Sequence, residues 1–305
     1  MFDRLAAGDY PATVNIKRTK NSIVLLVILA LSLHAQEHSG SYVEVLAKAE
    51  EGDAVAQRSL GLMRGTGQGA PKDLAEATKR LRKSADQNDA PAQSALGMMY
   101  RDGQGVDKDD IQALTWFRKS ASHGDAEGQY LLGYMYSDGR GVPRDYAEGV
   151  AWFRKSAEQQ NAAAEYALAL YYSQGKGVAK DYVEGAKWAQ KAADQNYADA
   201  QVGLGGAYFS GRGVPKNHVE AAKWYRKAAE QGNALAQGTI GAMFANGDGV
   251  PRNYVRAYMW DSLAEAQGDR TARDNIESLE HRMTPQQIAE AQALAQEFSN
   301  HNQLH

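Results

Sequence analysis

The stretch GRGVPRDYAEGVAWFRKSAE, residues 139–158, recurs along this 305-residue chain. It returns as GKGVAKDYVEGAKWAQKAAD at residues 175–194 and as GRGVPKNHVEAAKWYRKAAE at residues 211–230. The Gly-x-Gly turn that opens it occurs six times at intervals of 36 residues, at Gly67, Gly103, Gly139, Gly175, Gly211 and Gly247. A fixed period of this length predicts an all-α solenoid of helix-turn-helix repeats. No interval contains an insertion, so we expect no catalytic loop or extra domain between repeats.

Each repeat carries start signals for two helices, here called helix A and helix B. The paired glycines allow positive φ angles, which end helix A and turn the chain toward helix B. An Asp or Asn with Glu or Gln three residues later resembles a capping box at the start of helix B. These pairs are Asp73/Glu76, Asp109/Gln112, Asp145/Glu148, Asp181/Glu184 and Asn217/Glu220, whereas Asn253 is followed by Arg256 and its box is incomplete. Predicted N-caps of helix A are Asp53, Asp89, Asp125, Asn161, Asn233 and Asp269, with Tyr197 out of pattern.

Two further columns indicate how the helices pack. A glycine recurs inside helix A, where it costs roughly 1 kcal/mol relative to alanine, so the repetition predicts a close approach by the neighbouring helix. This column is Gly61, Gly97, Gly133, Gly205 and Gly241, with Ala169 in the fourth repeat. All five tryptophans fall in one column of helix B, at Trp116, Trp152, Trp188, Trp224 and Trp260. A tryptophan stripe could be a ligand platform, but at this helical spacing it favours a core position.

The ends of the chain have their own organisation. We expect a capping region at residues 36–53 with a lone helix B over 42–51, and the repeat solenoid over residues 54–283 with a last helix A over 270–280. Thr284-Pro285-Gln286-Gln287 resembles a capping box and predicts a C-terminal capping helix over 284–298. Residues 299–305, with His301 and His305, form a polar tail that we expect to be disordered.

Residues 1–35 resemble a secretory signal peptide. Lys17, Arg18 and Lys20 precede the apolar run IVLLVILALSL, residues 23–33, and Ala35 offers a small residue for cleavage. The run is short for a bilayer-spanning helix. We therefore expect a periplasmic or secreted protein, with an uncleaved anchor or a buried helix as the alternatives.

Composition excludes several kinds of function. The formal net charge of −3 does not suit a nucleic-acid-binding protein, which is normally basic. The chain has no cysteine, so disulfides, cysteine-bound zinc and thiol chemistry are excluded. The Gly-x-Gly turns lack a third glycine and a preceding strand, which argues against dinucleotide binding. We find no catalytic constellation, and we expect neither an enzyme nor a bound cofactor or metal.

Three motifs in sequence carry a resemblance to a known family. Ala92 to Tyr100 reads A-x-x-x-L-G-x-M-Y, Gly103 to Asp109 reads G-x-G-V-x-K-D, and Ala113 to Ala121 reads A-x-x-W-F-R-K-S-A. Together they resemble the Sel-1-like repeat, a helical repeat related to tetratricopeptide repeats, over about residues 42–298. The resemblance implies a helix-turn-helix solenoid that acts as a protein–protein adaptor, often in bacterial envelopes, and it implies no enzymatic activity.

Positions that vary between repeats are candidates for recognition. If helix A lines the concave face, as in tetratricopeptide solenoids, the shared Leu-Gly places a set of variable residues in the groove. These candidates are Arg58, Met98, Arg101, Tyr130, Tyr134, Tyr166 and Phe209, with Glu127 and Asp138 at further positions. Tyr and Arg are frequent interface hot spots, so we expect an aromatic patch of Tyr130, Tyr134 and Tyr166 beside Arg101. The alternative is that the tyrosine rings only cover the core.

A basic column offers a second candidate surface, called here the basic ridge. Its residues are Lys72, Lys108, Arg144, Lys180, Lys216 and Arg252, and Arg140, Lys176 and Arg212 add charge to it. Such a ridge could bind an anionic polymer or an acidic partner, or it could be only a solvated turn charge beside the helix cap.

The favoured hypothesis is an exported scaffold, adaptor or regulator of the bacterial envelope that binds a protein or peptide in the groove. We do not expect nucleic acid as a partner. We also expect no membrane contact beyond that of the N-terminal segment. The alternatives are a secreted immunoglobulin-binding factor, a polysaccharide-binding module that uses the ridge, and an enzyme acting on cell-wall material.

Overall fold

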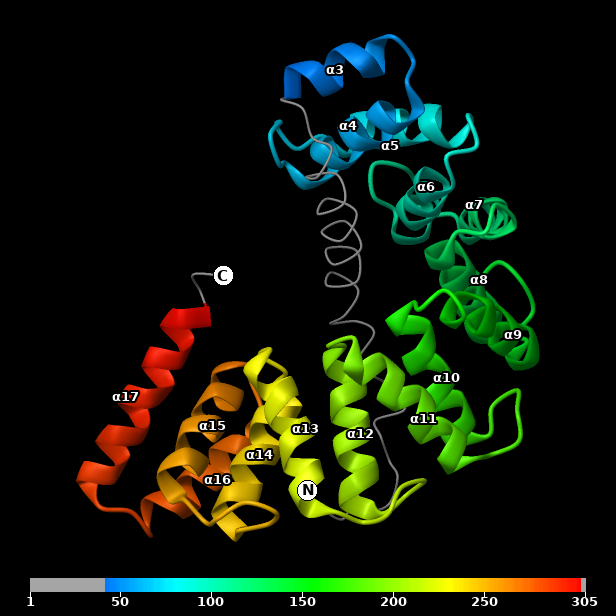
Figure 1. The fold of residues 1–305 in the computed structure, drawn as a ribbon. Helices are drawn as coiled ribbons and strands as arrows, with labels where there is room; N and C mark the ends of the chain where they lie inside the picture. Colours follow the sequence, from blue (N-terminus) through cyan, green and yellow to red (C-terminus); the bar gives the residue numbers. More distant parts are fainter. Residues whose placement is uncertain (1–41, 303–305) are drawn as a thin grey trace. The chain divides into compact units, whose positions relative to one another are not determined.

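The structure is a computed structural model that describes residues 42–302 (Figure 1). Within this range the chain forms α-helices and no strand, which confirms the predicted all-α class. The helices are α3 (Tyr42–Glu50), α4 (Ala54–Thr66), α5 (Leu74–Ala85), α6 (Ala90–Asp102), α7 (Asp110–Ser122), α8 (Ala126–Asp138), α9 (Tyr146–Ala157), α10 (Ala162–Gln174), α11 (Tyr182–Asp194), α12 (Ala198–Ser210), α13 (His218–Glu230), α14 (Ala234–Asn246), α15 (Tyr254–Ala266), α16 (Arg270–Glu280) and α17 (Pro285–Asn302). The predicted signal segment lies outside the described residues.

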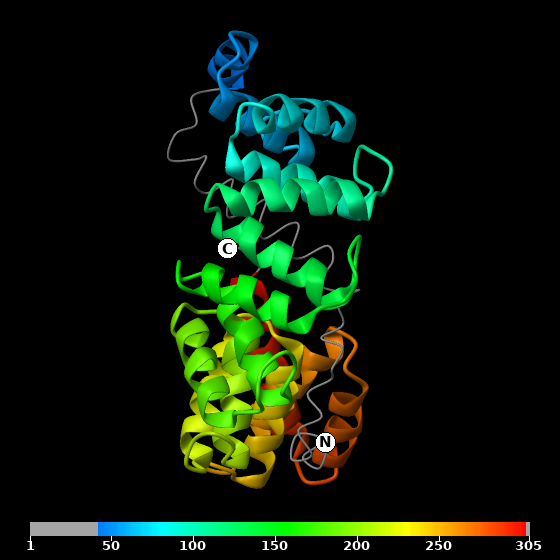
Figure 2. The same ribbon diagram turned by 90° about the vertical axis from the view of Figure 1, so that its right-hand side faces the viewer.

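The helices alternate between the two predicted types. Helix A is α4, α6, α8, α10, α12, α14 and α16, and helix B is α3, α5, α7, α9, α11, α13 and α15. The described residues divide into two compact units, with the boundary inside α10. The N-terminal unit comprises residues 42–164 and 176–178, and the C-terminal unit comprises residues 165–175 and 179–302. In each unit successive helices pack in chain order (Figures 1 and 2), and among the described residues no helix is long and apolar enough to cross a bilayer.

The predicted caps of helix B are present, but the capping box is only half formed. Oδ1 of Asp109 accepts from the backbone N–H groups of Ile111 and Gln112, at 2.9 and 3.0 Å. The reciprocal bond to the cap's own N–H is absent because that N–H already donates to the carbonyl of Tyr100 at the end of helix A. The other caps of helix B make the equivalent backbone bond, and Asn253 caps α15 despite Arg256. The full reciprocal box occurs at Thr284 and Gln287.

The glycine column inside helix A faces a bulky side chain of helix B. A Cβ atom added at Gly97 would lie 2.5 Å from the ring of Phe117, and one at Gly133 would lie 2.8 Å from the ring of Phe153. The predicted close approach is therefore confirmed, and a glycine is required because a methyl group would overlap the facing ring.

The second glycine of each turn has a role beyond its backbone angle. Gly105 has a φ of +70°, and a Cβ there would lie 2.0 Å from the carbonyl oxygen of Leu74 at the start of α5. The corresponding glycines of the four later turns approach the carbonyls of the preceding helix B in the same way, whereas Gly69 in the first turn faces only Met63 of its own repeat. The turn of one repeat thus packs directly on the previous repeat, which sets how successive repeats stack.

The tryptophan column is largely core, as predicted. Trp116, Trp224 and Trp260 are buried, while Trp152 and Trp188 are partly buried. In four repeats the lysine three residues later lies over the indole ring, with Nζ 3.8–4.2 Å from the ring centroid, at Lys119, Lys155, Lys191 and Lys227. These lysines therefore make cation–π contacts as well as favourable interactions with the helix dipole.

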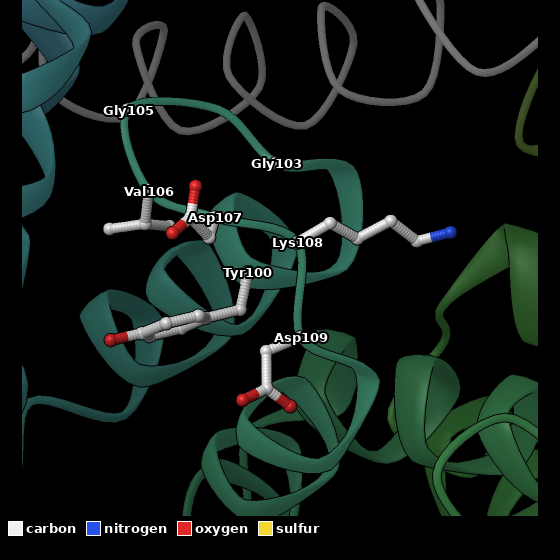
Figure 3. A pocket seen from close by; sticks show the side chains of 7 residues that line it. All are labelled: Tyr100, Gly103, Gly105, Val106, Asp107, Lys108 and Asp109. Carbon is white, nitrogen blue, oxygen red and sulfur yellow. The ribbon is translucent and has the colours of Figure 1, made fainter.

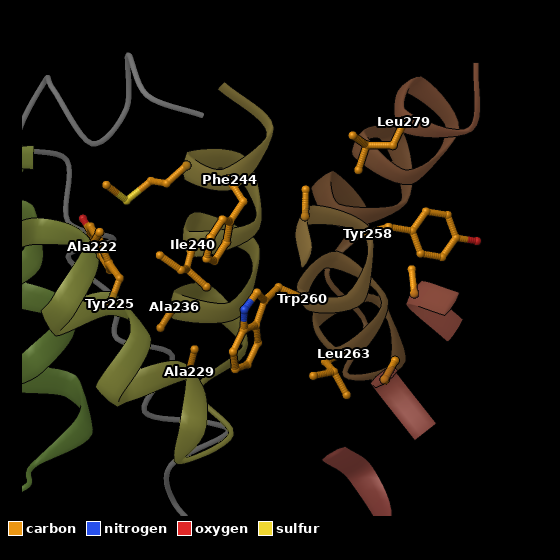
Figure 4. Packing of buried hydrophobic residues seen from close by; sticks show 14 of the residues in the cluster. Ala222, Tyr225, Ala229, Ala236, Ile240, Phe244, Tyr258, Trp260, Leu263 and Leu279 are labelled. Carbon is orange, nitrogen blue, oxygen red and sulfur yellow. The ribbon is translucent and has the colours of Figure 1, made fainter. Parts of the chain in front are cut away.

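The C-terminal end replaces this lysine with an apolar cover. Leu263 stands where the lysine would be, and the ring of Phe298 on α17 meets Trp260 edge-on at 5.1 Å. Figure 4 shows Trp260 with Ile240 and Phe244 in the core of the C-terminal unit. The helix α17 continues to Asn302, so residues 299–302 are helical rather than part of the predicted tail. Neither Gly nor Pro interrupts this segment, and Gln296 bonds to Asn300 one turn later.

Candidate functional site

The helix A face of the N-terminal unit carries a cluster of polar and aromatic side chains. On α8 the residues Glu127, Tyr130 and Tyr134 lie at i, i+3 and i+7 and therefore share one side of the helix. The opposite side, with Leu131 and Leu132, is buried in the core of the unit. The three side chains are partly exposed, so the helix presents them outward while its apolar side holds it in place.

Arg101 on α6 belongs to the same cluster. Its Nε and Nη2 donate to the two carboxylate oxygens of Asp102 at 2.9 and 2.7 Å. The side chain is buried, with 8% of the residue exposed. Burial opposes the charged form, but the bonds and charge of Asp102, helped by the nearby Tyr134 and Tyr130, raise the pKa of Arg101 overall. The guanidinium group of Arg101 is thus held in place by Asp102, which neutralises its charge.

Glu127 is the least satisfied group of the cluster. Nδ2 of Asn161 donates to its Oε2 at 3.2 Å, whereas Oε1 is buried and has no hydrogen-bond partner among the described residues. Burial raises the pKa of Glu127 to about 7, and the charge of Asp125 acts in the same direction against the lowering effects of Asn161 and Arg101. This carboxyl group can therefore change its charge near neutral pH.

The two tyrosines differ in their surroundings. The ring of Tyr130 packs on that of Phe153, with centroids 5.8 Å apart and planes tilted by 40°. Burial, followed by the carboxylate of Asp138, raises the pKa of Tyr134, which keeps this hydroxyl protonated. Both tyrosines are partly exposed, as is common in residues that bind another protein.

Arg58 on α4 is also paired. Its Nη1 lies 2.6 and 2.8 Å from the two carboxylate oxygens of Asp89, the N-cap of α6. The pair links two successive helices A, so Arg58 has a structural partner before any ligand binds.

A shallow hollow of about 780 Å³ lies at the turn between α6 and α7 (Figure 3). It is lined by Tyr100, Gly103, Gly105, Val106, Asp107, Lys108 and Asp109, and Figure 3 shows Lys108 extending away from Tyr100 and Asp107. Asp107 stands where most repeats have proline. The hollow contains neither a nucleophile beside a base nor converging metal ligands, and nowhere in residues 42–302 do three or more potential ligands form a metal site.

Comparison with family models places six consecutive Sel1 repeats on residues 54–89, 90–125, 126–161, 162–197, 198–233 and 234–269. The chain belongs to the Sel1 repeat family. Proteins of this family generally serve as non-catalytic scaffolds for protein–protein interaction. A comparison with curated proteins finds no match.

Solved structures of Sel1 repeat proteins are similar to this chain. A protective antigen present in uropathogenic Escherichia coli strains, which displays this repeat fold, is 33% identical over 86% of the chain, with a TM-score of 0.73. The match spans only 57% of that protein. A Sel1 repeat protein from Oxalobacter formigenes is 35% identical over 77% of this chain and 68% of its own, with a TM-score of 0.70. An immunity protein from Pseudomonas aeruginosa, 21% identical over 70% of this chain and 82% of its own with a TM-score of 0.50, shares the fold alone.

Two predicted groove residues are buried in the Sel1 repeats, and a third is partly covered by a neighbouring ring. Met98 is 3% exposed and packs in the core of the N-terminal unit, because its helical position turns it inward. Tyr166 is 9% exposed, and its ring lies 5.6 Å from that of Tyr197 in the C-terminal unit. Phe209 stacks on His218 at 4.5 Å. Met98 and Tyr166 therefore leave the candidate surface, and the expected three-tyrosine patch reduces to Tyr130 and Tyr134.

The basic ridge is exposed in every Sel1 repeat. Its residues are Lys72, Lys108 and Arg144 in the N-terminal unit, and Lys180, Lys216 and Arg252 in the C-terminal unit. Each packs its Cβ close to the first glycine of its turn, so the stem of the side chain has a packing role. Whether the charges bind a ligand stays a prediction.

The additional cations of the turns already contact the preceding repeat. Arg140 bonds to Asp110, with Nε 3.2 Å from Oδ2. Lys176 lies over the ring of Tyr146, and Arg212 lies over that of Tyr182, at 5.7 and 5.8 Å from the centroids. These side chains therefore join one repeat to the next, and their charges are already engaged in contacts within the solenoid.

The bond between Asn161 and Glu127 was not recognised from the sequence. A signal was present, because helix A has Asn as its N-cap only at Asn161 and Asn233, and each follows an acidic residue by 34 positions. Asn233 bonds in the same way to Asp199, at 3.2 Å. An amide can cap the helix and donate to an acid at once, whereas aspartate cannot donate.

Proposed function

We propose that this chain is an exported scaffold or regulator of the bacterial envelope, which holds a segment of a partner protein against the helix A face of its N-terminal unit. The observation that carries this proposal is the pair Tyr130 and Tyr134, which are partly exposed on one side of α8 beside the fixed Arg101–Asp102 ion pair. Anchored aromatic rings of this kind supply much of the binding energy in protein interfaces.

Other surfaces of the repeats are occupied by packing contacts within the solenoid. The glycine column meets helix B, the tryptophan column is covered by lysines, and the turns pack on the preceding repeat. By contrast, an outward position of helix A changes from Val55 to Pro91 to Glu127 in successive repeats. A position that varies while the fold repeats is available for recognition, and this supports the helix A face as the binding surface.

The N-terminal sequence supports export. Three basic residues precede an apolar run at residues 23–33, and a small residue follows at Ala35, as in secretory signal peptides. Mass spectrometry of the N-terminus of the protein purified from an envelope or culture-supernatant fraction tests this part. A mature chain that begins near residue 36 is expected, and an intact N-terminus on a cytoplasmic protein would contradict export.

The partner-binding part is tested by cross-linking and affinity purification from the envelope fraction. Wild type is compared with Tyr130→Ala/Tyr134→Ala, and Tyr136→Ala serves as a matched control. Tyr136 is on the same helix, but its hydroxyl accepts from Nη2 of Arg118 at 2.9 Å on another side of α8. A partner that is captured by wild type and by the control, and is lost in the double variant, is the expected result.

Circular dichroism is used to check that each variant keeps the helical fold. Equal capture by wild type and the folded double variant would place recognition elsewhere, and the basic ridge would then be the next surface to test.

A further inference from the structure

The charges on the helix A face of the N-terminal unit are not balanced once internal pairs are removed. Arg58 is neutralised by Asp89 and Arg101 by Asp102, in both cases through two oxygens of the carboxylate. The two remaining acids are on α8, namely Glu127 and Asp138. No ion pair joins either of them to a basic side chain within residues 42–302. The charge left over for a partner is therefore negative.

The helix A face of the C-terminal unit has the same sign. Asp199 on α12 is its acid at the position equivalent to Glu127, and the other outward positions of α10, α12 and α14 hold uncharged residues. Asn233 donates to Asp199, and burial raises the pKa of this carboxyl group. Basic residues, by contrast, are concentrated at the turns.

Of the two carboxyl groups on α8, that of Glu127 has a buried oxygen without a hydrogen-bond donor in the described part of the chain. Within residues 42–302 its Oε1 is buried without a hydrogen-bond partner, and the one bond to the carboxyl group comes from the neutral amide of Asn161. A buried carboxylate oxygen without a donor is costly, and an ammonium or guanidinium group relieves this cost better than a neutral donor. The Glu127 residue as a whole is partly exposed, on the same side of α8 as Tyr130 and Tyr134.

The neighbouring tyrosines suit a cation as well. Tyr130 and Tyr134 lie one helical turn apart on the same side of α8, and Asp138 follows Tyr134 by one more turn. A lysine or arginine stem packs well on aromatic rings, and its charged end is attracted to the ring face. This chain itself repeatedly places cations over aromatic rings, as Lys155 does over Trp152 at 3.8 Å.

We infer that Glu127, Tyr130, Tyr134 and Asp138 form a subsite for a lysine or arginine side chain of the partner segment. The stem of that side chain lies along the two rings, and its charged end bonds to the carboxylate of Glu127. Asp138 lies about 16 Å further along α8 and adds only its negative charge. The occupant is thus a basic segment of another protein. An acidic segment is disfavoured because the two guanidinium groups that act on Tyr134, those of Arg101 and Arg140, are already paired with Asp102 and Asp110. This inference rests on the proposed function and specifies the chemistry of the partner.

The test uses a random dodecapeptide library displayed on phage and selected against the full chain. Selected peptides are expected to share a lysine or arginine at a recurring position and to lose binding to Tyr130→Ala/Tyr134→Ala. A synthetic peptide from the selection is then compared with its version in which that residue is glutamine. Replacement is expected to weaken binding to wild type roughly tenfold, as for a charge pair removed from an interface.

A double-mutant cycle assigns the loss to the proposed carboxylate. Glu127→Gln preserves the shape and the Asn161 contact, and the two peptides are expected to bind this variant with nearly equal affinity. Glu220→Gln is the matched control, because Glu220 is an acid on α13 paired with Lys223, and the tenfold difference should persist there.

Two results would overturn the inference while leaving the proposed function intact. One is a set of selected peptides that need Tyr130 and Tyr134 but carry no common basic residue. The other is an undiminished tenfold difference in both Glu127→Gln and Asp138→Asn. Peptides that bind the double tyrosine variant as well as wild type would contradict the proposed function itself. A dimer in sedimentation whose formation is abolished by the same tyrosine changes would show that a second copy, not a basic segment, occupies the face.

Discussion

Nδ2 of Asn161 donates to Oε2 of Glu127 at 3.2 Å, while Oδ1 of the same asparagine accepts from the backbone N–H of Ala164 at 2.9 Å. One side chain therefore caps α10 and satisfies an acid on α8. The same arrangement joins Asn233 to Asp199 and to the backbone N–H of Ala236 in the C-terminal unit. An asparagine that caps helix A thus bonds to an acid in the preceding repeat.

Replacing this cap by aspartate is expected to destabilise the protein mainly at alkaline pH. Asn161→Asp keeps the capping oxygen but places a second carboxylate beside Glu127, whose pKa is already raised to about 7. At pH 8 both groups are charged, and we expect a loss of about 1–3 kcal/mol in the free energy of unfolding. At pH 5 Glu127 is protonated and can donate to the new carboxylate, so the loss should largely disappear.

Urea unfolding at pH 5 and pH 8 measures this difference. Asn217→Asp is the matched control, since Asn217 caps α13 through the N–H groups of Val219 and Glu220, and four other helix B caps are already aspartate. An equal loss at both pH values in Asn161→Asp would show that the repulsion with Glu127 is unimportant.

Asp261 is expected to make the C-terminal unit less stable as the pH rises. It stands where three other repeats have Phe117, Phe153 and Tyr225, is fully buried, and receives one bond from Asn275 at 3.2 Å. Burial raises its pKa to about 7, and Asp269 adds to the shift against the effect of Asn275. Because the folded-state pKa is above the unfolded value, the stability is full below about pH 4 and falls as pH rises toward 7.

Asp261→Asn removes this ionisation and keeps the shape of the side chain. We expect it to raise the free energy of unfolding at pH 8 by roughly 2–4 kcal/mol, with little change at pH 4. Thermal melts between pH 4 and pH 8 would show the effect as a flatter pH profile. Glu277→Gln, at an exposed acid of α16, should leave the profile unchanged, and a wild-type profile in Asp261→Asn would contradict the assignment.

Gly105 is expected to tolerate alanine much less well than Gly124. Both have positive φ angles, +70° and +83°, so alanine costs about 1–2 kcal/mol in each for the backbone alone. At Gly105 the new Cβ would also lie 2.0 Å from the carbonyl oxygen of Leu74, whereas nothing lies within 4 Å of it at Gly124. Gly105→Ala should therefore show a clearly lower melting temperature than Gly124→Ala, and equal losses would mean that the turn is free to move.

Removing the ring of Phe298 is expected to expose the last tryptophan. Phe298→Ala deletes the edge-on contact with Trp260, and we expect a loss of about 2–3 kcal/mol in the stability of the C-terminal unit. The tryptophan emission should also shift to longer wavelength. Phe298→Leu, which keeps much of the apolar cover, should lose less than half as much, and an unchanged emission in Phe298→Ala would contradict the capping role of α17.

The repeat itself could be predicted from local patterns. The turns recur every 36 residues, caps such as Asp109 act on residues two or three positions away, and glycines such as Gly97 face the next helix of the same repeat. One half of the predicted capping box, the bond from the N–H of the cap residue, is absent because that N–H bonds outside helix B. The N–H of each helix B cap had already been used by the carbonyl of the preceding helix A.

The candidate site was less predictable, because the orientation of a side chain depends on its neighbours in other helices. The register placed Met98 and Tyr130 on one face, but only the packing shows that Met98 is 3% exposed whereas Tyr130 is partly exposed. The charge of the face could not be obtained by counting residues either. It depends on which arginines are paired, and Arg101 proves to be neutralised by its own neighbour Asp102.

The sequence by itself determined the helices, their 36-residue period, the family and the places where a glycine or a cap was required, because these depend on backbone geometry and on contacts within a few residues. Only the tertiary structure decided that Oε1 of Glu127 lacks a donor within residues 42–302, that Asn161 donates to the other oxygen and that Gly105 and its later equivalents lie against the previous repeat. Those facts arise where helices 30 or more residues apart in the chain come into contact, and burial there changes both the charge and the packing that each residue can have.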